Sequence, residues 1–136
     1  MAAVVVDTHA AVWYLLNAKS LSSNAQRAMD EAVQAGDPVY VSSISFISLV
    51  EVVYLVEKGK LPAVVLDRLT HALSEPDSGF VIAPLNLTVA LAIPRISRET
   101  VPDMPDRIIA ATALDLGLRL VTRDSEISNT GIETIW

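Results

Sequence analysis

The stretch DMPDRIIAATALDLGLRLVTRD, residues 103–124, predicts a helix, a helix stop and a buried strand in direct succession. Asp103 suits a helix N-cap, and the carboxylate of Asp106 is favourable in the first turn, where the helix dipole is positive. The following residues are apolar nearly all round the helix and end at Gly117, so we expect a buried helix. The short apolar strand after it places Asp124 just beyond a strand end.

Strands and helices alternate along the rest of the chain, which favours a mainly parallel sheet covered on both faces. We therefore predict a three-layer α/β/α sandwich with the last strand at an edge. We expect a first helix that begins at residue 10 and a third that runs from about residue 44 to residue 59. The other expected helices cover residues 22–36, 62–74, 86–93 and 103–117. The expected strands cover residues 2–6, 39–41, 80–83, 118–122 and 132–135.

Composition predicts one globular domain over residues 1–136, because this length supports a sizeable core and 51% of the residues are hydrophobic. The absence of cysteine excludes disulfides, thiolate metal sites and cysteine nucleophiles, and fits a reducing compartment. The N-terminus lacks the basic segment of a signal peptide, and Glu51 interrupts the long uncharged stretch 38–56. We expect a cytoplasmic protein without membrane contact.

Acidic residues follow two of the predicted strands. Asp7 ends the first strand and Asp124 follows the fourth, so both are expected at the carboxyl edge of the sheet, where α/β proteins bind ligands. Asp7 is alternatively an N-cap of the next helix. Chain order alone places the helix start at Asp106 near the opposite edge, unless the preceding loop carries it across.

Glu51 is the only charged residue between Asp37 and Glu57, and its sequence neighbours are leucine and valine. A lone buried carboxylate costs several kcal/mol unless it has a partner, so we predict that Glu51 is buried for a functional reason. Ser48, one turn earlier, is a candidate hydrogen-bonding support. In the alternative interpretation, Glu51 lies on a polar face that reaches solvent.

A cluster of three or four carboxylates needs a cation, because like charges raise one another's pKa. Oxygen ligands without His or Cys select Mg²⁺ or Mn²⁺, and such a site suits phosphodiester hydrolysis by a metal-activated water. Thr8 and Thr122 are expected to hold the carboxylates by hydrogen bonds. The net charge of −6 argues against nucleic-acid binding by bulk electrostatics, although a cation in the acidic cluster weakens that objection.

Four ordered motifs resemble those of the PIN-domain ribonucleases, in particular the VapC-type toxins of bacterial toxin–antitoxin modules. They are VVDTHA near the start, SLVE in an apolar helix, DMPDRIIAATAL, and LVTRD. The resemblance extends from residue 4 to residue 136. It implies a four-acid Mg²⁺ or Mn²⁺ site at Asp7, Glu51, Asp106 and Asp124, with Asp103 as an accessory acid. It also implies that the start of the Asp106 helix reaches the carboxyl edge.

The same resemblance implies an endoribonuclease toxin with an RNA substrate. It further implies a homodimer and a cognate antitoxin protein that blocks the site, with operator DNA bound only through the antitoxin. Two alternatives stay open: a PIN nuclease acting in RNA processing or on DNA, and a catalytically silent PIN interaction module. A Mg²⁺-binding receiver module is disfavoured, because no lysine follows Lys60 and no acid directly follows the middle strand.

Overall fold

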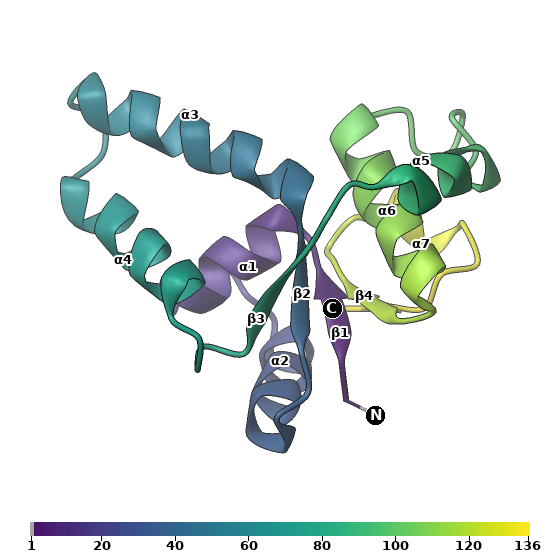
Figure 1. Ribbon diagram of the computed structural model, residues 1–136, viewed down its shortest axis with the longest axis horizontal. Coiled ribbons are helices and arrows are strands. Elements are labelled where there is room, and N and C mark those ends of the chain that lie inside the picture. The colour runs from purple at the N-terminus through teal and green to yellow at the C-terminus, as the bar shows by residue number, and fades with distance from the viewer. Residues whose placement is uncertain (1) are drawn as a thin grey trace.

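A five-stranded, fully parallel sheet lies at the centre of the computed structural model, which describes residues 2–136 (Figure 1). Its central strand β1 (Val4–Val6) pairs with β2 (Val39–Ser42) on one side and β4 (Arg119–Val121) on the other, so that Val6 lies opposite Val41 and Val121. This sheet confirms the predicted fold class. In spatial order the other strands are β3 (Phe80–Ala83) and β2 (Val39–Ser42) on one side, and β4 (Arg119–Val121) and β5 (Thr134–Ile135) on the other.

Two hydrophobic cores cover the two faces of the sheet. Successive strand residues point to opposite faces, so Val5 enters one core while Val4 and Val6 enter the other. The first core holds α5 (Leu87–Ala92), α6 (Met104–Leu116) and α7 (Ser125–Ser128), and the second holds α1 (Thr8–Leu15) and α2 (Ser23–Ala35). All three residues of β1 are fully buried, which fixes the position of the residue that follows them, Asp7.

Helix α6 forms as the sequence predicts. Asp103 is its N-cap and accepts a hydrogen bond from the backbone N–H of Asp106 at 3.3 Å. Gly117 ends the helix with φ 67°, a left-handed conformation that glycine adopts without steric cost. Residues 108–113 are buried without interruption, which confirms the predicted burial of this helix.

Helices α3 (Phe46–Glu57) and α4 (Ala63–Ser74) pack on each other and extend away from the sheet (Figure 1). The predicted helix 44–59 is divided into a 3₁₀ turn at Ser43–Ser45 and α3, which has no fully buried residue. The sequence prediction also missed the 3₁₀ turn at Ile93–Arg95 and the short helix α7 after Asp124. No helix of the described residues 2–136 is long and apolar enough to cross a membrane.

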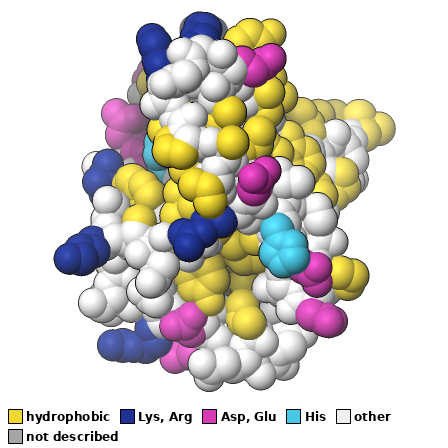
Figure 2. Space-filling model, turned by 90° about the vertical axis from the view of Figure 1, so that its left-hand side faces the viewer, with side chains coloured by type: hydrophobic (Ala, Val, Ile, Leu, Met, Phe, Trp, Pro, Cys, Tyr) yellow, Lys and Arg dark blue, Asp and Glu magenta, His cyan; other side chains and the backbone are white. Residues whose placement is uncertain are grey.

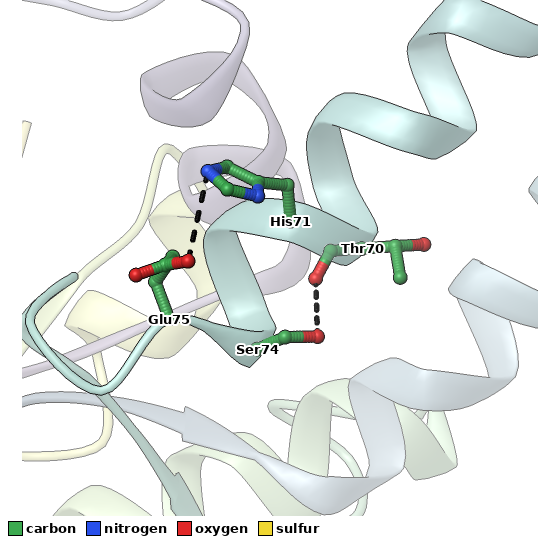
Figure 3. A network of polar contacts seen from close by, with 4 residues as sticks. All are labelled: Thr70, His71, Ser74 and Glu75. Atoms are coloured by element: carbon green, nitrogen blue, oxygen red, sulfur yellow. Dashed lines mark hydrogen bonds and ion pairs between the residues drawn. The ribbon is translucent and has the colours of Figure 1, made fainter.

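The side of the molecule that carries α3 and α4 has no extended surface of one charge. Figure 2 shows basic and acidic side chains interspersed there, with hydrophobic side chains between them. At the end of α4, Nε2 of His71 lies 3.9 Å from Glu75, and the hydroxyl of Ser74 donates to the carbonyl of Thr70 at 2.6 Å (Figure 3). These contacts are exposed and join residues of α4 to one another or to the residue that follows it, so they are local helix contacts and not a site.

Candidate active site

A pocket of about 230 Å³ opens where β1 and β4 end, and three aspartates reach it from different segments. Asp7 follows β1, Asp124 follows β4, and Asp106 lies in the first turn of α6. The remaining lining residues are His9, Trp13, Arg123 and Trp136.

Asp7 is held rigidly by its backbone and by both carboxylate oxygens. Its backbone N–H donates to the carbonyl of Val121 at 3.0 Å. Oδ1 accepts from the backbone N–H of Ala10 at 2.8 Å, and Oδ2 accepts from the hydroxyl of Thr122 at 2.6 Å. Burial raises the pKa of Asp7, the hydrogen bonds from Thr122 and Ala10 oppose that rise, and the charge of Asp124 adds to it. Asp7 is therefore both a helix N-cap and a pocket residue.

Thr122 connects two of the three aspartates. Its side chain is almost fully buried at 2% exposure, and its hydroxyl both donates to Asp7 and accepts from the backbone N–H of Asp124 at 3.1 Å. Thr122→Val keeps the shape but removes both hydrogen bonds. We expect the free energy of unfolding to fall by about 1–3 kcal/mol, measured by urea denaturation at pH 7.

Thr112→Val is the matched control for this substitution. Thr112 is equally buried, at 1% exposure, but its hydroxyl donates only to the backbone carbonyl of Ile108 within α6. Thr112→Val is expected to lower the free energy of unfolding by less than about 1 kcal/mol, because the carbonyl of Ile108 keeps its backbone hydrogen bond within the helix. An equal fall in the free energy of unfolding in the two variants would contradict a specific stabilising role for the hydrogen bonds between Thr122 and the two aspartates.

Asp106 lies at the carboxyl edge, so the expectation from chain order alone was wrong. Helix α6 ends at Leu116 and leads directly into β4 at Arg119, at the amino edge of the sheet. The helix therefore runs antiparallel to the strands, and its first turn lies at the opposite, carboxyl edge. Nε of Arg107 donates to the carbonyl of Ile96 at 2.8 Å, which fastens the preceding loop to this helix start.

The pKa of Asp106 is raised to about 6, mainly by burial and then by the charges of Asp103, Asp124 and Asp7, in that order. Asp103 itself is exposed and does not line the pocket, so it acts on Asp106 through its charge and its N-cap bond. In the described part of the chain, the one ion pair within 4.0 Å joins His71 and Glu75, on α4. The four aspartates thus form a concentration of negative charge, and none of them is in an ion pair within 4.0 Å with a described base.

The sequence comparisons agree with this architecture. The family model of the PIN domain matches residues 4–133. The chain belongs to the PIN-domain family. This PIN domain is 31% identical over 129 residues to ribonuclease VapC22 of Mycobacterium tuberculosis, and the alignment covers 93% of this chain and 91% of the relative. The resemblance to VapC-type proteins inferred from the four motifs is confirmed.

Solved structures share the fold of this PIN domain. A chain of VapBC2 from Rickettsia felis, crystallised with a DNA fragment from the promoter, matches with a TM-score of 0.70 and 16% identity, covering 98% of this chain and 99% of that one. A chain of FitAcB from Neisseria gonorrhoeae matches with a TM-score of 0.67 and 22% identity, covering 96% and 95%. A toxin–antitoxin complex from Klebsiella pneumoniae gives a TM-score of 0.58 at 24% identity, covering 90% and 87%.

Glu51 of this PIN domain is exposed, so the prediction that it is buried was wrong. It lies on a shallow surface of α3 with Tyr54 and Lys58, and the structure does not bring it to the pocket of the three aspartates. The apolar sequence around Glu51 misled the prediction because α3 leaves several large apolar side chains exposed, among them Val50 at 53% and Tyr54 at 58%. On a helix that projects from the sheet, an apolar sequence context does not imply burial.

Thr8 and Ser48 also lie apart from the three carboxylates. Both line a small apolar cavity between α1, α3 and α4. There the hydroxyl of Thr8 hydrogen-bonds the hydroxyl of Ser45 at 2.7 Å. Of the three hydroxyl residues predicted to support the acids, Thr122 is the one that contacts a carboxylate in the described hydrogen bonds.

The three carboxylates of the pocket fit a hard divalent cation such as Mg²⁺ or Mn²⁺, because such ions prefer oxygen ligands and no ion pair within 4.0 Å in the described residues occupies these carboxylates. Within residues 2–136, no three His, Asp or Glu side chains converge closely enough to enclose a metal ion by themselves. Mg²⁺ is usually held by one or two carboxylates together with waters and substrate phosphates. The pocket therefore fits an open site completed by water and substrate, rather than a closed protein cage.

Sequence reasoning did not place His9, Trp13, Arg123 and Trp136 together in this pocket. Two of them are next to predicted site acids in the sequence, since His9 lies two residues after Asp7 and Arg123 directly precedes Asp124. Proximity in sequence to the acids was the available signal. The convergence of the two tryptophans depends on tertiary packing and has no such signal.

Proposed function

We propose that this PIN domain is a metal-dependent endoribonuclease and the toxin of a toxin–antitoxin pair. The observation that carries the proposal is the convergence of Asp7, Asp106 and Asp124 on one open pocket, in which none of the three forms an ion pair within 4.0 Å with a base of the described residues. The relationship to a protein named ribonuclease VapC22 supports RNA cleavage as the reaction.

In the proposed reaction, Asp7, Asp106 and Asp124 would hold Mg²⁺ or Mn²⁺ at the carboxyl edge of the sheet, together with water and substrate oxygens. A cation held there would lower the pKa of a water and stabilise charge on the phosphate that is attacked. Asp7 is oriented by Thr122 and Ala10, and one oxygen of Asp124 is oriented by the backbone N–H of Glu126 at 2.9 Å. These hydrogen bonds fix the carboxylates before substrate arrives, which reduces the reorganisation needed during the reaction.

The proposed partners are an RNA substrate, a cognate antitoxin protein and a second copy of the chain in a homodimer. Two of the structural neighbours carry the names of toxin–antitoxin assemblies, and one of these was crystallised with promoter DNA. We infer that operator DNA is bound through the antitoxin, because the net charge of −6 disfavours direct binding by this chain. A cytoplasmic location is part of the same proposal.

The test is cleavage of single-stranded RNA by the purified chain with Mg²⁺, with Mn²⁺ and with EDTA. We expect cleavage with either metal, loss of cleavage to background in EDTA, and recovery when metal is added in excess. A DNA oligonucleotide of the same sequence distinguishes the alternative: cleavage of DNA but not RNA would favour a PIN nuclease acting on DNA. No cleavage together with no metal binding by calorimetry would favour the catalytically silent interaction module.

A further inference from the structure

We propose that Trp13 and Trp136, together with Arg123, form a platform that stacks an RNA base and positions the strand beside the three aspartates. This inference rests on the proposed ribonuclease function and specifies how the pocket holds its substrate. All three residues line the same pocket as Asp7, Asp106 and Asp124.

The aromatic rings form a tilted cluster that leaves part of each tryptophan accessible. The ring centroid of Trp13 lies 5.9 Å from that of Trp136 at an interplanar angle of 57°, and 5.5 Å from that of His9 at 41°. Both tryptophans are half-buried, so their inner sides pack on the core of α1 and α2 while other parts face the pocket. Nδ2 of Asn24 donates to the carbonyl of Trp136 at 3.3 Å and so fixes its backbone.

Arg123 adds a positive charge to this cluster. Its guanidinium carbon lies 5.1 Å from the centroid of Trp13, in a cation–π contact, although Arg123 is adjacent in sequence to Asp124. The side chain is exposed, and no ion pair within 4.0 Å joins it to an acid of the described residues. A guanidinium held by a ring rather than by a carboxylate remains available to bind a phosphate.

The combination matches one base and two neighbouring phosphates of an RNA strand. Carboxylates hold the cation that contacts the reacting phosphate, an arginine binds a neighbouring phosphate, and a tryptophan ring stacks on the base. Stacking is tolerant of sequence because every base has a π-face, and it requires an unpaired base. The platform therefore selects single-stranded segments and loops of RNA over paired regions.

The surface beyond Trp136 extends this path. A second pocket is lined by Trp136 together with two more arginines, Arg27 and Arg119. Trp136 thus borders one pocket that contains Arg123 and a second that contains Arg27 and Arg119 beside a single acid, Glu31, within a chain whose net charge is −6. We place the nucleotides next to the stacked base along these arginines.

The first test uses tryptophan fluorescence, because the two tryptophans of the chain are both in the platform. The full chain carrying Asp7→Asn, with Mg²⁺, is titrated with a short single-stranded RNA and with an abasic oligonucleotide of equal length and charge. We expect quenching and saturable binding with the RNA, and binding about 5- to 150-fold weaker, without quenching, with the abasic strand. Equal affinity for both strands would overturn the platform.

The second test separates stacking from folding. In the chain with an intact acid site, Trp136→Leu is expected to raise KM for RNA by about 5- to 150-fold with a smaller change in kcat, while Trp136→Phe restores most of the affinity. Tyr54→Leu removes an aromatic ring that is exposed on α3, outside this pocket, and is expected to change neither constant. Circular dichroism checks that each variant is folded.

The outcomes distinguish this inference from the function on which it rests. Metal-dependent cleavage with an unchanged KM in folded Trp136→Leu would overturn the platform and leave the ribonuclease proposal standing. Base-dependent quenching in a chain that cleaves no RNA would support the platform and overturn the proposed reaction.

Discussion

Asp106→Asn is expected to lower RNA cleavage by at least about a hundredfold while making the metal-free protein more stable at neutral pH. Loss of a residue that only supports a metal ligand already costs about 10–100-fold, so loss of a carboxylate in the proposed ligand set is expected to cost more. Asparagine has the same shape and lacks the charge. A loss of cleavage together with a gain in stability distinguishes a carboxylate that serves the reaction from one that stabilises the fold.

The stability effect follows from the raised pKa. Folding raises the pKa of Asp106 from its ordinary value of 3.8 to about 6, mainly because of burial and then the neighbouring aspartates. The folded state therefore binds the proton of Asp106 more tightly than the unfolded state does. The contribution of this proton to the free energy of unfolding is fully present below about pH 4 and is lost as the pH rises through about 6. Because Asp106 is only half-buried, we expect a modest gain for Asp106→Asn at pH 8 in EDTA, roughly 2–5 °C in Tm.

Thermal unfolding of both proteins at pH 5 and pH 8, in EDTA and in Mg²⁺, measures this difference. The gain is expected to be smaller at pH 5, and added Mg²⁺ is expected to raise the Tm of the unaltered protein more than that of the variant. Asp115→Asn, the same change on an exposed position of α6 outside the pocket, is the control and is expected to retain cleavage. Retained cleavage in Asp106→Asn would remove Asp106 from the site.

The elements that could be predicted from the sequence are those whose signals are local. Helix α6 has its N-cap at Asp103, its stop at Gly117 and an unbroken apolar body, and each of these depends only on neighbouring residues. The run of three valines in β1 predicted a buried central strand for the same reason, since β-branched residues on both faces suit a doubly covered sheet. Parallel order then placed Asp7 and Asp124 at one edge.

The edge at which Asp106 lies was mispredicted although the predicted elements determine it, because a helix that leads directly into a strand of a parallel sheet begins at the carboxyl edge. The other features that were missed depend on tertiary packing. The exposure of Glu51 follows from the projection of α3, because the same apolar neighbours would bury it if another layer covered that helix. The pocket wall of Trp13 and Trp136 joins residues from the two ends of the chain, so no spacing rule connects them.

Asp124→Asn is expected to lower cleavage at least about a hundredfold, whereas Glu51→Gln is expected to change it less than about threefold. Asp124 lines the pocket with Asp7 and Asp106, and its Oδ1 accepts the N-cap hydrogen bond of α7, a role that asparagine performs equally well. Folding should therefore survive the substitution, and the loss should report on the charge alone. Glu51 is exposed on α3 and lies outside this pocket.

Measuring kcat/KM for both variants with the same RNA and metal decides between a three-aspartate site and the four-acid site that the family resemblance implies. A loss in Glu51→Gln comparable to that in Asp124→Asn would contradict the three-aspartate site. Because α3 projects from the sheet without a fully buried residue, such a result would require α3 to move toward the pocket when metal or RNA binds. A small effect at Glu51 beside a large one at Asp124 would instead assign the chemistry to the carboxyl ends of β1 and β4 and the start of α6.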